Sequence, residues 1–193
     1  MQRSQPRPVL RGFTLIEVMV VISFIALMAS VVIGALGTVR DQAKYTRAVK
    51  EMDTIYIAAM QYKFDTGVFS SRCDTTCNED TDPFLVAPVG VAGWKGPYDS
   101  VWDKAHPWGG SYSISQYEVD GVNTFSIVLD DDQPGMGPGD NQGLVPTEAL
   151  VAVDRLLDNG DLATGSFFGD GRDEYADPGP RCPAGEGCWT PFR

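Results

Sequence analysis

Four aspartates in a glycine-rich stretch have the composition of a metal site. Asp130, Asp131, Asp132 and Asp140 lie in DDDQPGMGPGDNQG, which is too polar and glycine-rich to form a helix or a strand. Calcium takes about six to eight hard oxygen ligands, and glycines let backbone carbonyls turn toward an ion. The D-x-D-x-D-G spacing of an EF-hand is missing, and an acidic loop that is simply solvated has the same composition. Composition alone therefore leaves both interpretations open.

The four cysteines fall into two local pairs. Cys73 and Cys77 lie in CDTTC, and Cys182 and Cys188 lie in CPAGEGC. Outside the cytoplasm such pairs form disulfides, and bonds 73–77 and 182–188 are the simplest connectivity. A zinc site built from all four thiolates is the alternative, but the spacings fit zinc knuckles poorly. We predict two disulfides.

Catalytic patterns are scarce in this sequence. His106 is the only histidine. It stands just before Pro107, which favours a turn or surface residue over a catalyst. The sequence has no nucleophile elbow, phosphate loop or defensible pair of carboxylates. We therefore expect that the chain is not an enzyme, with a membrane-anchored enzyme as the least favoured alternative.

Glu17 interrupts a long apolar run. Residues 1–12 form a basic leader with three arginines, and residues 13–37 are almost continuously apolar. After residue 12 the chain has 12 basic and 26 acidic residues. A basic start before an apolar run predicts a cytoplasmic leader, a transmembrane helix and an acidic domain outside. The net charge of −11 argues against nucleic acid as a partner. A plain anchor would tolerate Glu17 near its end.

The helix is expected to continue beyond the apolar run. Residues 38–66 contain no proline, and their apolar positions recur mostly at steps of three and four residues. These positions are Val39, Ala43, Val49, Met52, Ile55, Ala59 and Tyr62. This spacing predicts an amphipathic helix with one face on a core. Gly67 can take the left-handed conformation that ends a helix. Because no proline separates this segment from the apolar run, we predict one helix of about 50 residues, apolar all round in its first half and striped in its second.

Residues 67–193 read as a loop-rich globular domain with a small antiparallel sheet. Segments 111–119 and 122–129 flank Asp120-Gly121, a dipeptide suited to a tight hairpin turn. Phe125, Ile127 and Leu129 alternate, which predicts a half-buried strand. The stretch PTEALVAVDRLLDNG predicts a short helix with Thr147 as N-cap, and Leu150, Val153, Leu156 and Leu157 as its apolar stripe. The predicted class is α+β.

The stretch from Arg11 to Glu17 identifies a family. Arg11-Gly12-Phe13-Thr14-Leu15-Ile16-Glu17, followed by the apolar run, resembles the class III leader of type IV pilins and type II secretion pseudopilins. The resemblance implies that a prepilin peptidase cuts after Gly12 and methylates the amine of Phe13. It also implies that the apolar run anchors the subunit in the inner membrane and then forms the core of a helical homo-oligomeric filament. Glu17 would pair with the Phe13 amine of a neighbouring copy, since a lone buried charge is costly.

A second resemblance narrows the family. Trp94-Lys95-Gly96-Pro97-Tyr98, followed by His106-Pro107-Trp108-Gly109-Gly110-Ser111-Tyr112, is similar to the major pseudopilin of type II secretion, with His106 where that family usually has aspartate. It implies a pilin-like fold and a periplasmic pseudopilus, with other pseudopilins and an inner-membrane assembly platform as partners. It also implies calcium in the loop after the sheet, with Asp132, Asp140 and either Asp130 or Asp131 as ligands. The aromatic residues are expected to fill the core.

One segment departs from that pattern. LLDNGDLATG, residues 156–165, resembles a stretch near the C-terminus of many pilin-like proteins that typical major pseudopilins lack. It keeps open a major or minor pilin of a type IV pilus, used for adhesion, motility or DNA uptake. The segment itself predicts a helix end and a tight turn, with a second ion site as the less favoured alternative.

Overall fold

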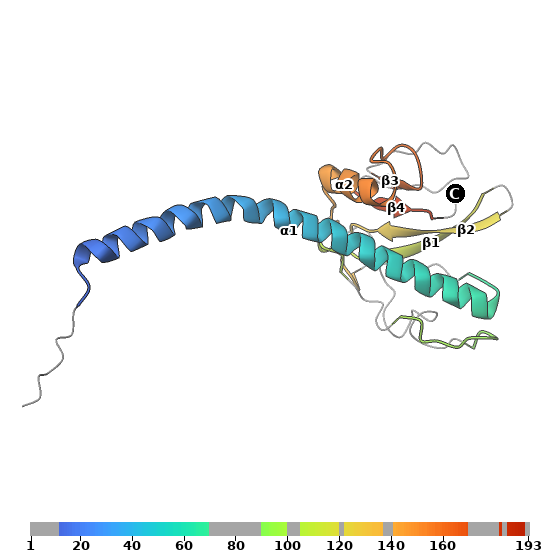
Figure 1. The fold of residues 1–193 in the computed structure, drawn as a ribbon. Coiled ribbons are helices and arrows are strands. Elements are labelled where there is room, and N and C mark those ends of the chain that lie inside the picture. The colour runs from blue at the N-terminus through green and yellow to red at the C-terminus, as the bar shows by residue number, and fades with distance from the viewer. Residues whose placement is uncertain are drawn as a thin grey trace, which may run out of the picture. The chain divides into compact units, whose positions relative to one another are not determined.

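The computed structural model describes residues 12–69, 90–99, 105–119, 122–136, 141–169, 182 and 185–191. By contact the chain divides into two units, Met1–Gln42 and Ala43–Arg193. The elements are α1 (Leu15–Thr66), β1 (Tyr112–Val119), β2 (Val122–Leu129), α2 (Thr147–Leu157), β3 (Phe167–Gly169) and β4 (Gly187–Trp189), as Figure 1 shows. A long N-terminal helix and a small antiparallel sheet confirm the predicted α+β class.

Helix α1 is a single helix of 52 residues, as the sequence predicts. It ends where Gly67 takes a positive φ of 79° and its N–H donates to the Lys63 carbonyl at 2.8 Å. This is the left-handed termination predicted for Gly67.

The first unit exposes its apolar side chains. Phe13 is 89% exposed and Phe24 is 63% exposed. Within the part of the chain that the structure describes, no helix has both the length and the hydropathy of a membrane span. The predicted transmembrane segment 13–37 is therefore not confirmed.

In the second unit, one face of α1 is buried in the core. Ala48, Met52, Ile55, Ala59 and Tyr62 are each at most 1% exposed and follow one another at steps of three and four residues. Two positions of the predicted stripe are wrong. Ala43 is exposed because the buried core of this unit begins only at Ala48, and Val39, which belongs to the first unit, is 62% exposed.

The sheet has four antiparallel strands in the order β1-β2-β4-β3. Val119 lies opposite Val122, which confirms the predicted hairpin; the turn at 120–121 lies outside the described residues. The sequence did not predict β3 and β4, since alternation cannot be recognised in three-residue strands. Both are held by pairing: Cys188 lies opposite Val128 of β2 and Phe168 of β3.

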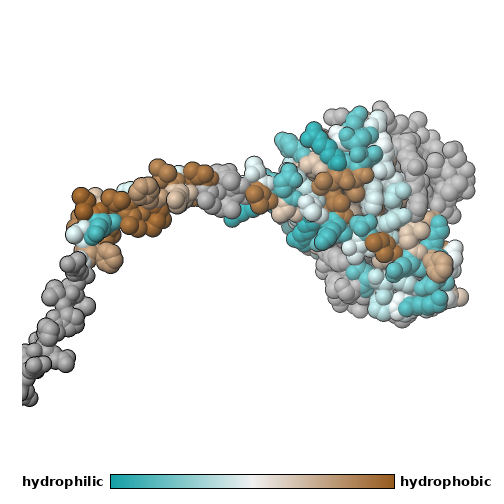
Figure 2. All heavy atoms as spheres, viewed as in Figure 1, coloured by the Kyte–Doolittle hydropathy of each residue, from teal (hydrophilic) through white to brown (hydrophobic). Residues whose placement is uncertain are grey.

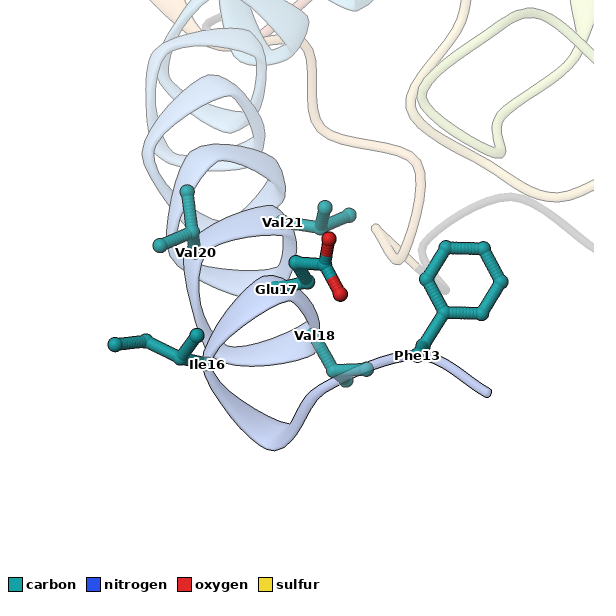
Figure 3. A pocket seen from close by; sticks show the side chains of 6 residues that line it. All are labelled: Phe13, Ile16, Glu17, Val18, Val20 and Val21. Atoms are coloured by element: carbon teal, nitrogen blue, oxygen red, sulfur yellow. The ribbon is translucent and has the colours of Figure 1, made fainter. Parts of the chain in front are cut away.

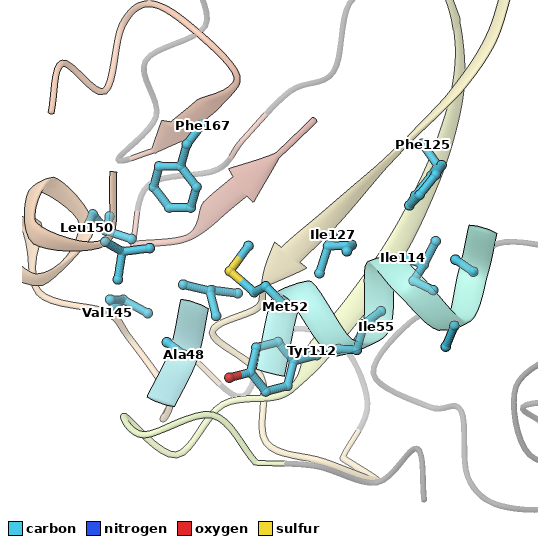
Figure 4. Close-up of a cluster of buried hydrophobic side chains, with 14 of the residues drawn as sticks. Ala48, Met52, Ile55, Tyr112, Ile114, Phe125, Ile127, Val145, Leu150 and Phe167 are labelled. Carbon is cyan, nitrogen blue, oxygen red and sulfur yellow. The ribbon is translucent and has the colours of Figure 1, made fainter. Parts of the chain in front are cut away.

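In β2, residues 125–129 are buried on both faces of the strand. Ile114, Phe125 and Ile127 lie with Met52 and Ile55 in the main core (Figure 4). On the other face, Ser126 and Val128 are also buried, and Val128 clusters with Phe168, Cys182 and Cys188. The prediction of a half-buried strand is therefore wrong, because the C-terminal segment covers the second face.

Helix α2 begins differently from the prediction. Its N-cap is Pro146, whose carbonyl accepts from the N–H groups of Ala149 and Leu150, and no side chain caps it. Thr147 is already the first helical residue, so its predicted role as N-cap is wrong. Leu156 is 53% exposed, and Asp154 takes a place on the buried face instead.

Candidate functional site

The N-terminus of α1 is closed by a reciprocal cap between Thr14 and Glu17. The Thr14 N–H and the Thr14 hydroxyl each donate to Oε2 of Glu17 at 2.8 Å, and the Glu17 N–H donates to the Thr14 hydroxyl at 3.3 Å. This is a capping box, in which the first and fourth residues satisfy helix N–H groups that have no intrahelical partner. The T-x-x-E spacing is the sequence signature of a capping box, but this cap was not predicted.

The carboxylate of Glu17 lies on one side of the helix with its neighbours one turn away. Figure 3 shows Glu17 and Val21 pointing to the side on which Phe13 lies, whereas Ile16 and Val20 point to the other. Both hydrogen bonds that Glu17 accepts use Oε2, so within the described residues Oε1 has no donor. Figure 2 shows hydrophobic side chains along this half of α1. Oε1 can therefore accept a hydrogen bond from a second polar group, and the helix surface around it is apolar.

Gly12 and Phe13 precede the helix as exposed, non-helical residues. A Cβ added to Gly12 would meet no atom within 4 Å. Both residues that flank the predicted cleavage point are therefore exposed. Arg11 lies outside the described residues.

His106 is a buried turn residue. Its N–H donates to the Gly110 carbonyl at 2.8 Å, and Gly109 donates back to the His106 carbonyl at 2.9 Å. Nδ1 accepts from the Trp108 N–H, so Nε2 carries the proton and donates to the Asp130 carbonyl at 2.8 Å. Burial lowers the pKa of His106 to about 4, which keeps the ring neutral. His106 therefore ties the turn to the acidic loop, as a structural residue and not a surface one.

The acidic loop packs against two glycines. Gly143 donates to the Asp131 carbonyl at 2.7 Å, and Ser111 donates to the Asp132 carbonyl at 2.8 Å. A Cβ on Gly110 would collide with the Asp130 carbonyl, and a Cβ on Gly143 would collide with the Gly110 backbone. The two glycines thus form a backbone cradle for the start of the loop.

Carboxylates from two distant segments meet at this loop. Asp130 and Asp131 are each only 8% exposed. Their carboxylate oxygens and that of Glu186 lie within 4.8 Å of one another. Burial and the nearby charges of the loop aspartates raise the pKa of Glu186 to about 8. Glu186 was not predicted, because only the sheet pairing brings it here.

Of the other predicted ligands, Asp132 is described and Asp140 is not. The Asp132 carboxylate accepts from the Asn141 N–H at 3.1 Å and is not in the group with Glu186. Asp140 lies outside the described residues. Of the three predicted aspartates that the structure describes, two have carboxylates in the group with Glu186.

The second cysteine pair forms a disulfide. Cys182 and Cys188 are bonded, with their Cα atoms 5.8 Å apart, and both are buried. These sulfurs cannot serve as thiolate zinc ligands in the bonded form. Cys73 and Cys77 lie outside the described residues.

The motif from Trp94 to Tyr98 has a structural role, as predicted. Lys95 pairs with Asp65 at 2.9 Å, and the Tyr98 hydroxyl donates to the same carboxylate at 3.0 Å. Trp94 and Tyr98 pack against the core, and Tyr112 is buried in it. Trp102 lies outside the described residues.

The segment after α2 is a hydrogen-bonded turn. Asn159 Oδ1 accepts from the Asp161 N–H, and Asp161 Oδ1 accepts from the Ala163 N–H. These contacts confirm the predicted tight turn. The nearby Asp154 side chain is buried, and burial raises its pKa to about 6.

Comparison with known proteins gives a consistent set of relatives. The chain is 30% identical over 147 residues to type II secretion system core protein G of Pseudomonas aeruginosa, covering 70% of this chain and 92% of that protein. It is 29% identical to the protein of the same name from Vibrio cholerae, covering 68% and 89%, and 30% identical to that from Aeromonas hydrophila, covering 62% and 82%. No family model matches the chain. No solved structure matches it either.

Proposed function

We propose an assembly mechanism for this chain, which belongs to the family of type II secretion system core protein G, the major pseudopilins, and is a structural subunit of a pseudopilus. The observation that carries the mechanism is the exposed apolar N-terminal half of α1, which follows the exposed Gly12 and Phe13 and holds one carboxylate in its first turn. A soluble monomer does not keep such a surface exposed, so a lipid or a neighbouring subunit must cover it.

The first step is processing by a prepilin peptidase. Cleavage after Gly12 removes the basic leader, and methylation of the new amine keeps its positive charge. Gly12 and Phe13 are exposed and non-helical, which leaves the bond between them accessible. The capping box at Thr14 stabilises the helix that follows. Mass spectrometry of the mature chain tests this step. A chain that begins at Phe13 and is heavier by one methyl group is expected, whereas one that still begins at Met1 would contradict it.

The second step is filament assembly from the inner membrane, with the globular domain in the periplasm. Lipid covers residues 13–37 before assembly and other pseudopilin subunits cover them afterwards, with an inner-membrane platform feeding the fibre. Glu17 Oε2 remains in the capping box, while Oε1 accepts a hydrogen bond from the Phe13 amine of a neighbouring copy. A buried charge that loses its partner costs about 3–5 kcal/mol, so the pair fixes the register between subunits.

We also propose that calcium binds the loop at 130–143. The donors fit this ion: Asp130 and Asp131 are buried carboxylates, and the Gly110–Gly143 cradle holds the loop carbonyls in place. Oxygens bound to one calcium at about 2.3–2.6 Å lie at most about 5 Å apart, which the grouped carboxylates satisfy. Asp132 and Asp140 remain predicted ligands. Bound calcium would supply positive charge to this acidic loop and so stabilise the fold.

Thermal unfolding of the full chain in detergent tests the calcium proposal. Calcium at about 100 times its dissociation constant stabilises a folded protein by about 2.7 kcal/mol. We expect the melting temperature to rise with calcium and to fall when a chelator is added. Identical melts in excess calcium and in excess chelator would contradict the site.

A further inference from the structure

The disulfide of the C-terminal segment closes a short loop that carries Glu186. Cys182 and Cys188 are six residues apart, and Cys188 lies in β4, opposite Val128 of β2. The Gly185 carbonyl accepts from the Val145 N–H at 3.0 Å. Glu186 therefore lies between two residues with paired backbones: Gly185 accepts from Val145, and Gly187 pairs with Leu129 of β2.

The register of the sheet places Glu186 beside the acidic loop. Gly187 lies opposite Leu129 at the end of the β2–β4 pairing. In an antiparallel pair, the residues that follow this position on β2 and precede it on β4 continue side by side. Asp130 and Glu186 are those residues, which explains why their carboxylates meet although they are 56 positions apart.

Glu186 also lies beside the disulfide itself. One of its carboxylate oxygens is within 4.8 Å of both sulfur atoms. The side chain is therefore held between the disulfide and the two buried aspartates. Three carboxylates at one place repel one another unless a proton or a cation joins them.

We propose that Glu186, presented by the disulfide-closed loop 182–188, is a calcium ligand, so that the disulfide and the ion stabilise each other. This inference rests on the proposed calcium site. Coupling between two equilibria is reciprocal: if the disulfide strengthens calcium binding by a given factor, calcium strengthens the disulfide by the same factor. The ligand comes from a segment that follows the predicted binding loop by more than 40 residues.

Isothermal titration calorimetry of the full chain in detergent, with calcium as the titrant, tests the inference. Glu186→Gln keeps the size of the side chain and removes its charge; Glu148→Gln, at an exposed position in the first turn of α2, is the matched control. We expect Glu186→Gln to weaken binding at least tenfold and the control to bind like the wild type. The double variant Cys182→Ser/Cys188→Ser should weaken binding about fivefold, at the low end of typical couplings. The double variant is used in place of a chemical reductant, because a reductant would also reach Cys73 and Cys77.

A third arm separates ligation from a general structural effect. Adding Cys182→Ser/Cys188→Ser to Glu186→Gln should weaken binding no further, because the disulfide acts through Glu186. In excess chelator, Glu186→Gln should melt at the same temperature as the wild type or higher, since glutamine brings no negative charge beside the two aspartates. A variant that melts lower in both calcium and chelator would contradict a ligand role.

The outcomes distinguish the two proposals. Calcium binding by the wild type with equal affinity in Glu186→Gln would overturn this inference and leave the calcium site standing. Absence of calcium binding by the wild type would overturn both.

Discussion

Tyr112 joins the sheet to α1 through one short hydrogen bond. Its hydroxyl donates to Glu51 at 2.6 Å, and Glu51 also pairs with Arg47 at 2.9 Å. Tyr112 is only 2% exposed, and burial raises the pKa of its hydroxyl well above the usual range. The Tyr112→Phe substitution keeps the ring and removes this bond alone.

The expected cost follows from the surroundings of Glu51. Hydrogen bonds to charged groups contribute about 1.5–3 kcal/mol. The Glu51 side chain is 24% exposed, so water can replace part of the lost bond, and Arg47 still neutralises the charge. We therefore expect a loss of about 1.5 kcal/mol, at the lower end of that range. At about 2–4 °C per kcal/mol for a domain of this size, the melting temperature should fall by about 3–6 °C.

Chemical and thermal unfolding of the full chain in detergent measure this loss. Tyr45→Phe is the control, because Tyr45 stacks on Trp108 and its hydroxyl has no hydrogen bond within the described part of the chain. The control should change the free energy of unfolding by less than about 0.5 kcal/mol. If Tyr112→Phe costs no more than the control, the reasoning about the Tyr112–Glu51 bond is refuted.

Two further predictions concern the acidic loop and the end of α2. Gly143→Ala should destabilise the fold by about 1–3 kcal/mol, because its Cβ would overlap the Gly110 backbone. The control Gly37→Ala should not destabilise it, because a Cβ at Gly37 meets nothing within 4 Å. Equal melting temperatures for the two variants would refute the cradle. Asp154→Asn should be more stable than the wild type by about 1 kcal/mol at pH 8. The folded pKa of about 6 lies above the ordinary value of 3.8, so the folded state binds the extra proton and its stability falls as pH rises through 6. The advantage of Asp154→Asn should vanish near pH 4 in urea unfolding, and a pH-independent difference would contradict it.

The sequence predicted the elements that local patterns encode. The long α1, its end at Gly67 and the β1–β2 hairpin follow from apolar spacing, a glycine and a two-residue connection. The motif at Gly12, Phe13 and Glu17 lies in one contiguous stretch, and its roles in processing and assembly stay predictions. The capping box between Thr14 and Glu17 is also encoded locally, in the T-x-x-E spacing of the same stretch.

Features that depend on distant pairing could not be predicted. Strands β3 and β4 are three residues long and exist because they pair with β2 and with each other. Burial of Val128 and Ser126 follows from that pairing, as does the meeting of Glu186 with Asp130. The extent of the α1 stripe was overestimated because spacing marks an apolar face but not where its partner begins. Val39 and Ala43 lie before that point.

In the proposed mechanism, the charge of Glu17 drives assembly, and its capping box with Thr14 does not. Glu17→Gln keeps an oxygen that can accept the Thr14 N–H but loses the charge. Thr14→Val removes the capping hydroxyl and keeps the charge. Loss of the ion pair costs about 3–5 kcal/mol, whereas loss of a cap costs about 1 kcal/mol.

The direct measurement is the fraction of subunit in filaments, compared with membrane-bound subunit, by sedimentation and immunoblotting. The chain is expressed with its peptidase and assembly platform. We predict that Glu17→Gln is cleaved after Gly12 but lowers the filament fraction at least tenfold, while Thr14→Val retains at least half of it. Normal filaments from Glu17→Gln, or an equal defect in both variants, would contradict the account.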